Sequence, residues 1–189
     1  LFKIFISAFL IDNVILMRFL ALCPFIGMSS DEDKSVGMGL AVIFVTLLAT
    51  SATWPLYHFV LKPLGLEFLQ ILVFILIIAA LVQLVEFYLK KSAPALYASM
   101  GIYLALITTN CAILAVTFDN ISKGYNFAES LVYAFGVASG FMLSLLLLAG
   151  VRNRIKTSPI PAFLKGTPIL FVAASLLSMA FMGFSGLVK

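Results

Sequence analysis

Long apolar runs separated by short polar breaks make up the chain from end to end. A run of about 20 apolar residues is the length that crosses the hydrocarbon core of a bilayer as an α-helix. The sequence therefore predicts an all-α, polytopic membrane protein with six transmembrane helices, at residues 2–28, 36–61, 67–89, 95–118, 127–150 and 163–187. Because every connection between these runs is short, we expect a single membrane domain, 1–189, without a separate extramembrane catalytic domain.

The overall composition agrees with this prediction. Hydrophobic residues make up 63% of the chain and charged residues 11%, whereas soluble domains have roughly 45–50% apolar and about 25% charged residues. The net charge of +4 comes from Lys and Arg residues that are spread over the connections, so we expect no nucleic-acid partner. The first run, 2–28, is too long for the core of a signal peptide, and we expect a retained transmembrane helix.

The basic residues of the connections predict the orientation in the membrane, because cytoplasmic loops carry the excess of Lys and Arg. Four lie on one side and seven on the other. The sparser side holds Lys3, Lys62, Lys123 and Lys189, and the richer side holds Lys34, Lys90, Lys91, Arg152, Arg154, Lys156 and Lys165. Both termini are therefore expected outside, and Trp54, Tyr57 and His58 are expected at the outer interface.

The six predicted helices divide into two halves of three, 1–91 and 92–189. Because three is odd, the halves cross the membrane in opposite orientations, which is the arrangement of an inverted repeat with a site at the midplane. Each half has one cysteine, Cys23 or Cys111, near the middle of its first helix. The pattern thus predicts a 3+3 inverted repeat.

Cys23 and Cys111 are the only cysteines, and polar residues or a proline disturb the helix at each of them. Pro24, which lacks a backbone donor, follows the first, and Thr108, Thr109 and Asn110 precede the second. We therefore expect the first helix of each half to be interrupted at its cysteine. Irregular backbone at this depth is tolerated only where protein or a cavity covers it, and the N–H groups freed there can donate to sulfide or thiolate.

Two thiolates are half of what a four-cysteine iron–sulfur cluster needs, so a second subunit would have to supply the other half. The competing interpretation is that both cysteines are small buried hydrophobes. A disulfide between them is disfavoured, because the bilayer hides it from the oxidising machinery. Zinc needs four ligands, and this chain offers no further Cys and no buried His for it.

Three ionisable residues lie in or near the apolar runs: Asp12, Arg18 and Glu86. Because a charge inside a membrane costs free energy, each of them is a candidate for a functional role. Asp12 and Arg18 are not on one helical face, so we expect no direct pair between them. Glu86 lies about one turn from Lys90 and Lys91, and we expect it to reach the interface. The small residues Gly136–Gly140 are typical of helix packing. No dinucleotide fingerprint or P-loop is present, so NAD and ATP chemistry must belong elsewhere.

At three segments the sequence closely resembles a known family, the A subunit of the Rnf complex and its sister, the E subunit of the sodium-pumping NADH:quinone oxidoreductase. These segments are Phe19–Phe25, Leu106–Ala112 and Phe181–Leu187, and the resemblance extends over essentially the whole chain. Ala21, Ala105 and Ala115 depart from the family pattern, which puts only fine backbone geometry in doubt. Pro24 favours the Rnf branch slightly.

The resemblance implies an electron-transfer subunit, in the inner membrane of a bacterium, of a complex that oxidises reduced ferredoxin, reduces NAD and moves Na⁺ or H⁺ outward. It implies a [2Fe–2S] cluster with Cys23 and Cys111 as metal ligands and with Asn110, Thr109 and Thr108 beside it. The partner would be the Rnf E subunit, which is homologous, has six helices in the opposite orientation and gives two more cysteines. Other subunits would carry flavins and iron–sulfur clusters. The competing hypothesis is a redox-silent inverted-repeat transporter or channel, with Asp12 or Glu86 on an ion path.

Overall fold

The computed structural model of the chain describes residues 2–11, 13–29, 32–65, 67–92, 106–157, 159 and 166–183. Within these ranges the backbone is helical apart from turns and short breaks, and no strand occurs. The prediction of an all-α chain is confirmed for the part that is described.

The region predicted as the first transmembrane helix is broken into several pieces. They are α1 (Phe2–Ile6), a π-helical turn η1 (Ser7–Ile11), α2 (Val14–Arg18) and α3 (Leu22–Met28). The remaining elements are α4 (Glu32–Leu56), the π-helical turn η2 (Tyr57–Leu61), α5 (Lys62–Leu64), the 3₁₀ turn η3 (Glu67–Leu69), α6 (Gln70–Ser92), α8 (Cys111–Ser122), α9 (Phe127–Lys156) and α10 (Thr167–Met182).

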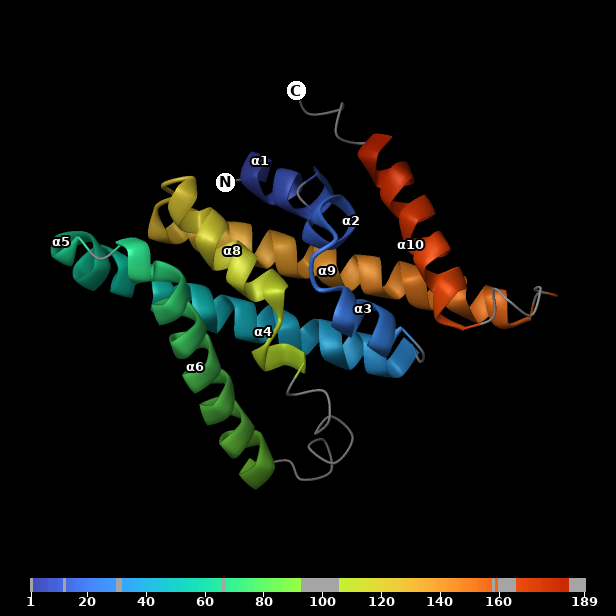
Figure 1. Cartoon of the computed structure of the whole chain (residues 1–189), viewed down its shortest axis with the longest axis horizontal. Coiled ribbons are helices and arrows are strands. Elements are labelled where there is room, and N and C mark those ends of the chain that lie inside the picture. Colours follow the sequence, from blue (N-terminus) through green and yellow to red (C-terminus); the bar gives the residue numbers. More distant parts are fainter. Residues whose placement is uncertain are drawn as a thin grey trace.

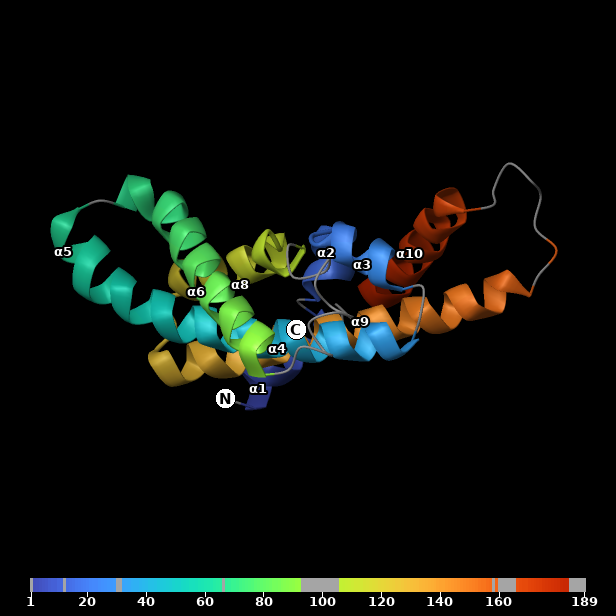
Figure 2. The same cartoon turned by 90° about the horizontal axis from the view of Figure 1, so that it is seen from below.

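Two long helices, α4 and α9, lie side by side along the longest dimension of the molecule (Figure 1). The short helices α2, α3 and α8 lie together over one side of this pair, and Figure 2 shows them as a second layer. Helices α6 and α10 flank this layer and slope away from it in opposite directions (Figures 1 and 2). Side chains such as Phe25 on α3, Met38 on α4 and Leu145 on α9 are fully buried and belong to one hydrophobic core.

Close packing of α9 against the N-terminal pieces depends on two glycines. A Cβ at Gly140 would stand 2.8 Å from the carbonyl oxygen of Phe9, and one at Gly136 would stand 2.8 Å from the Cβ of Ala8. The side chain of Asn13, at the break between η1 and α2, donates to the carbonyl oxygen of Gly140 over 3.1 Å and lies 2.6 Å from the Ser144 hydroxyl. The small residues of α9 therefore serve helix packing, as the sequence predicted.

Among the described residues, three helical stretches are long and apolar enough to cross a membrane: Ser35–Leu61, Gln70–Phe87 and Phe127–Lys156. Two shorter apolar helices cover Leu106–Ser122 and Thr167–Met182. These stretches overlap five of the predicted spans, although residues 95–105 of the span 95–118 lie outside the described residues. The remaining predicted span is the broken N-terminal region.

The predicted end of the fifth span at residue 150 was wrong, because α9 continues through Arg152 to Lys156. Basic residues are good helix formers and are favourable in the last turn of a helix, so they do not stop it. The Arg152 guanidinium donates to the carbonyl oxygen of Ile26 over 3.2 Å and to the Ser29 hydroxyl over 3.1 Å. These bonds attach the end of α9 to the C-terminal end of α3.

Candidate functional site

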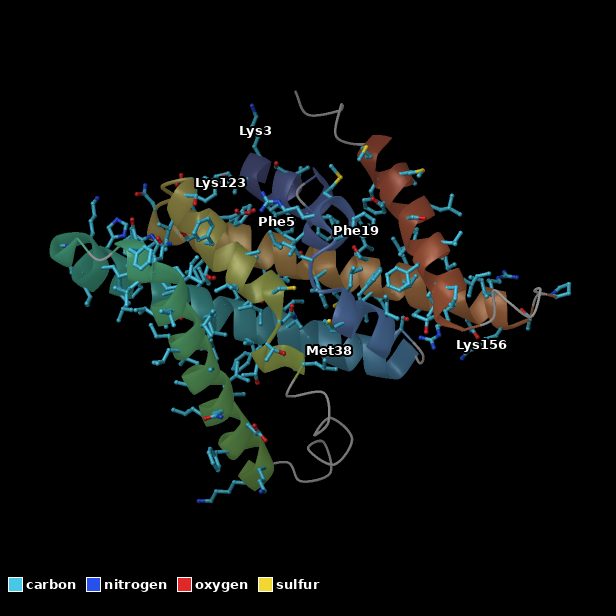
Figure 3. The ribbon with its side chains drawn as sticks, in the orientation of Figure 1. Lys3, Phe5, Phe19, Met38, Lys123 and Lys156 are labelled. Atoms are coloured by element: carbon cyan, nitrogen blue, oxygen red, sulfur yellow. The ribbon has the colours of Figure 1, made fainter. Side chains whose placement is uncertain are left out.

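The first helix break lies at Phe19–Ala21, between α2 and α3; Figure 3 labels Phe19 there. Phe19 and Ala21 have φ values of 53° and 59°, in the left-handed region that costs a non-glycine residue about 1–2 kcal/mol. Cys23 is the second residue of α3, just past this break, and it is exposed.

Pro24 does not cause the break, contrary to the expectation from the sequence. It is the third residue of α3, inside the first turn. The first N–H groups of a helix have no partner within the helix, so a proline there removes no hydrogen bond. The backbone is left-handed at Phe19 and Ala21, before Cys23, and α3 then continues through Pro24.

The second break separates a helical turn at 106–108 from α8. Asn110 has extended backbone, with φ −71° and ψ 111°, and its side-chain oxygen accepts from the N–H of Ala112 over 3.0 Å. This is the usual N-cap bond, and it explains why a helix can begin here in an apolar sequence. Cys111 is the first residue of α8 and is exposed.

The two breaks meet at the cysteines. The N–H of Ala21 donates to Sγ of Cys111 over 2.8 Å, although the residues are 90 positions apart. Since Cys23 follows Ala21 by two residues, its Cα lies at most about 7 Å from that of Ala21. Both thiols are free in the structure. The structure thus gathers the two cysteines at one place, each in the first turn of a helix that follows a break.

Two cavities open beside Cys111, between α8 and α6. One measures about 290 Å³, and three of the four other predicted site residues, Thr108, Thr109 and Asn110, line it together with Cys111. Its remaining lining residues are Ile75, Ile78, Ala79 and Leu114. Cys23 does not line this cavity. It therefore lies near the other predicted site residues but outside the cavity that they share.

The second cavity measures about 300 Å³ and also reaches Cys111. Apolar side chains form most of its wall, but Arg18 and Asp119 line it as well. The Arg18 guanidinium lies 3.1 and 2.9 Å from the two carboxylate oxygens of Asp119, and the Tyr133 hydroxyl donates to the same carboxylate over 3.1 Å.

Asp119 was not among the residues predicted from the sequence, which placed it at the start of a connection. In the structure α8 continues to Ser122, and Asp119 lies buried inside it. A carboxylate within an apolar helix is tolerated because Arg18 and Tyr133 compensate for the loss of water. The sequence does contain a sign of this ion pair. The acidic Asp119 follows Cys111 and the basic Arg18 precedes Cys23, both near the predicted breaks. Asp12 lies outside the described residues, and Glu86 is half-buried on α6.

No group of three or more His, Cys, Asp or Glu side chains that could hold a metal ion occurs among the described residues. The chain alone therefore offers two thiols to a metal centre. A further polar group is at hand: the side-chain nitrogen of Asn110 is buried and has no partner within the described part of the chain. An orphaned donor in the wall of the cavity that Cys111 also lines is suited to an acceptor that another molecule brings.

Comparison with known proteins adds to this geometry. A family model described as "Rnf-Nqr subunit, membrane protein" matches residues 1–188. The A subunit of the ion-translocating oxidoreductase complex of Syntrophotalea carbinolica is 53% identical over 188 residues, covering 100% of this chain and 97% of that protein. The A subunit of the same complex from Cereibacter sphaeroides is 52% identical over 186 residues, covering 98% and 96%. The A subunit of the Na⁺-translocating ferredoxin:NAD⁺ oxidoreductase complex of Acetobacterium woodii is 50% identical over 184 residues, covering 97% and 96%.

Proposed function

Because the chain belongs to the Rnf-Nqr family of membrane-protein subunits, we propose that it is an electron-transferring subunit of an ion-translocating oxidoreductase complex. The overall reaction is electron transfer from reduced ferredoxin to NAD⁺ coupled to Na⁺ or H⁺ transport, in line with the name of the Acetobacterium woodii relative. The single observation that carries a redox role for this chain is the meeting of its two free cysteines at facing helix breaks.

In this proposal Cys23 and Cys111 hold half of a [2Fe–2S] cluster, and a partner subunit supplies two further cysteines. When bound, such a cluster accepts and passes on single electrons. The proposal fits the chemistry of the site, because thiolates are the natural ligands of iron–sulfur clusters and both thiols are exposed on the isolated chain. Two thiols without a third such ligand among the described residues are what a shared centre requires of one subunit.

The chain's own residues would stabilise thiolates at this place. The N–H of Ala21 points its donor at Sγ of Cys111, and the start of α8 adds the positive end of a helix dipole to the same sulfur. The side-chain nitrogen of Asn110 offers another donor to a bound acceptor. Ile75, Ile78 and Leu114 form an apolar wall that limits water at the site.

The partner in this proposal is a homologous six-helix subunit of opposite orientation, matching the Rnf E subunit, and further subunits carry flavins and iron–sulfur clusters. The chain itself would be a 3+3 inverted repeat in the bacterial inner membrane with both termini outside. Two observations support this topology. Each predicted half has a break near the cysteine of its first span. Lys123, at the end of α8 shortly before α9 begins, and Lys156, the last residue of α9, were predicted on opposite sides and lie toward opposite ends of α9 (Figure 3).

Serine substitution of each cysteine tests the function. Cys23→Ser and Cys111→Ser should abolish electron flow from ferredoxin to NAD⁺ while the complex still assembles, because serine does not replace a thiolate ligand. If the cysteines only pack, the exchange costs about 1–3 kcal/mol at most and turnover persists. Gly27→Ala, on the same short helix α3 and with open space at its Cβ, is the matched control and should leave turnover normal. Normal turnover in either serine variant would leave the redox-silent transporter as the better hypothesis.

A further inference from the structure

Arg18 and Asp119 form the ion pair that joins the two broken helices. Arg18 is the last residue of α2, directly before the first break, and Asp119 lies on α8, after the second break. The guanidinium nitrogen is 2.9 Å from the nearer carboxylate oxygen, with side-chain exposures of 45% for Arg18 and 13% for Asp119. The two residues are 101 positions apart, so the contact is a product of the fold.

The carboxylate is held in place from a second direction. Tyr133 of α9 is 1% exposed and donates its hydroxyl hydrogen to Asp119 over 3.1 Å. Lys123 in turn lies 3.4 Å from that hydroxyl and 4.5 Å from the centre of the Tyr133 ring. Asp119 is therefore fixed by contacts to α2 and α9 as well as by its own helix, and it fixes the direction in which Arg18 points.

Stability alone is a weak reason for such an arrangement. Taking the Asp119 carboxylate out of water is costly, and an ion pair with a half-exposed guanidinium recovers little of that cost. Ionisable residues inside transmembrane segments are accordingly rare and are usually functional. The function of this ion pair should therefore follow from the part of the molecule that lies next to it.

The pair faces the cysteine site. Arg18, Asp119 and Cys111 line the same cavity of about 300 Å³. Among the described residues that line either cavity beside Cys111, Arg18 is the only cation and Asp119 the only anion. Asp119 is eight residues after Cys111 on one helix, which corresponds to about 12 Å. Asp119 is largely buried, so its charge is screened less at this distance than a charge on an open surface would be.

We infer that Arg18 and Asp119 set the reduction potential of the redox centre at Cys23 and Cys111, with Arg18 as the tuning charge and Asp119 as its positioning residue. The inference rests on the proposed function, because it needs a centre whose charge becomes more negative on reduction. A positive charge on the cavity wall favours the reduced state, and an uncompensated negative charge disfavours it. The ion pair keeps these two influences nearly balanced.

This account predicts shifts of opposite sign for the two partners. Arg18→Gln removes the positive charge that lines the cavity and leaves Asp119 without its ion-pair partner, so it should lower the midpoint potential of the centre. Asp119→Asn keeps an oxygen acceptor for Arg18 but removes its counterion, and it should raise the potential. Arg18→Lys should stay close to the parent protein, because a single nitrogen of Arg18 makes both contacts with the carboxylate and a lysine nitrogen can replace it. The double variant Arg18→Gln with Asp119→Asn should also return to the parent value.

The measurement is a redox titration of the purified complex followed by the EPR signal that depends on Cys111. Lys62→Gln is the control, because it removes one exposed positive charge in α5 that lines neither cavity, and it should not move the potential. If the Arg18→Gln complex fails to assemble, the Asp119→Asn variant alone tests the inference, which requires that it raise the midpoint potential.

Three results would overturn the inference. Equal potentials in all variants would remove any tuning role, and shifts of the same sign in both single variants would show that the pair only clamps the helices. A parent complex without any signal that depends on Cys111 would refute the proposed function itself, and the inference with it. The first two results leave the Cys111-dependent signal in place, so they refute the inference without refuting the function.

Discussion

The N–H of Ala21 donates a hydrogen bond to Sγ of Cys111 over 2.8 Å, and so the break in one helix is directly bonded to the first residue after the break in another. Ala21 can present its N–H in this way because its backbone is left-handed, with φ 59°. In a regular helix the same N–H would be used within the helix. The strained conformation at Ala21 is therefore tied to the geometry of the cysteine site.

Replacing Ala21 by glycine should relieve this strain and keep the donor. The left-handed conformation costs alanine about 1–2 kcal/mol, whereas glycine adopts it freely and loses only a buried methyl group and some backbone entropy. Ala138→Gly is the matched control, because Ala138 is equally buried but lies in the middle of α9. We expect Ala21→Gly to be more stable than Ala138→Gly by at least about 1 kcal/mol in thermal unfolding of the purified complex. Equal losses would mean that Ala21 is not strained.

Asn110 should have two separable roles. Its side-chain oxygen caps α8, so Asn110→Ala should destabilise the helix by about 1 kcal/mol, while Asn110→Asp and Asn110→Ser retain a capping oxygen and should preserve it. Hydrogen exchange of the α8 amides measures this difference. Asn110→Asp also removes the buried nitrogen and adds a negative charge beside Cys111, so the redox signal should weaken although the helix is intact. A normal signal in Asn110→Asp would assign Asn110 to capping alone.

Two glycines of α9 should respond in opposite ways to alanine. At Gly140 the new Cβ would stand 2.8 Å from the backbone oxygen of Phe9, which cannot move without displacing the N-terminal helices. We expect Gly140→Ala to cost about 1–3 kcal/mol. At Gly150 nothing lies within 4 Å of the new Cβ, and alanine should stabilise the helix by roughly 0.5–1 kcal/mol. Unfolding midpoints of the two variants check this, and a tolerated Gly140→Ala would show that α9 does not pack so closely there.

The sequence was sufficient to predict the helical class and the approximate location of both breaks. Apolar length is a strong signal for membrane helices, and polar residues at Cys111 do mark a break, because Asn110 caps the helix that follows. The position of the first break was harder to predict from the sequence. A proline is the obvious candidate for a helix breaker, but Pro24 lies in a first turn where it is harmless, and the break falls on Phe19 and Ala21, which carry no local signal of a left-handed backbone.

The sequence patterns could not predict which side chains far apart in the chain would pair in the fold. A charge in an apolar run predicts the end of the run, which places Asp119 in a connection and ends the fifth span before Arg152. Both residues lie within helices and bind distant groups: Asp119 binds Arg18, and Arg152 binds Ile26 and Ser29. Only the fold brings such partners together. The six-span repeat, the shared cluster and the partner subunit remain proposals.

The central claim is that Cys23 and Cys111 hold part of an iron–sulfur centre, and the most direct measurement is the non-haem iron of the purified complex together with its reducible EPR signals. Compared with the parent complex, Cys23→Ser and Cys111→Ser should each lack about two iron atoms and one reducible signal, because a [2Fe–2S] cluster would be lost and the centres of other subunits would remain. Gly27→Ala should match the parent in both. Fully assembled serine variants with the parent's iron content and all of its signals would contradict the claim.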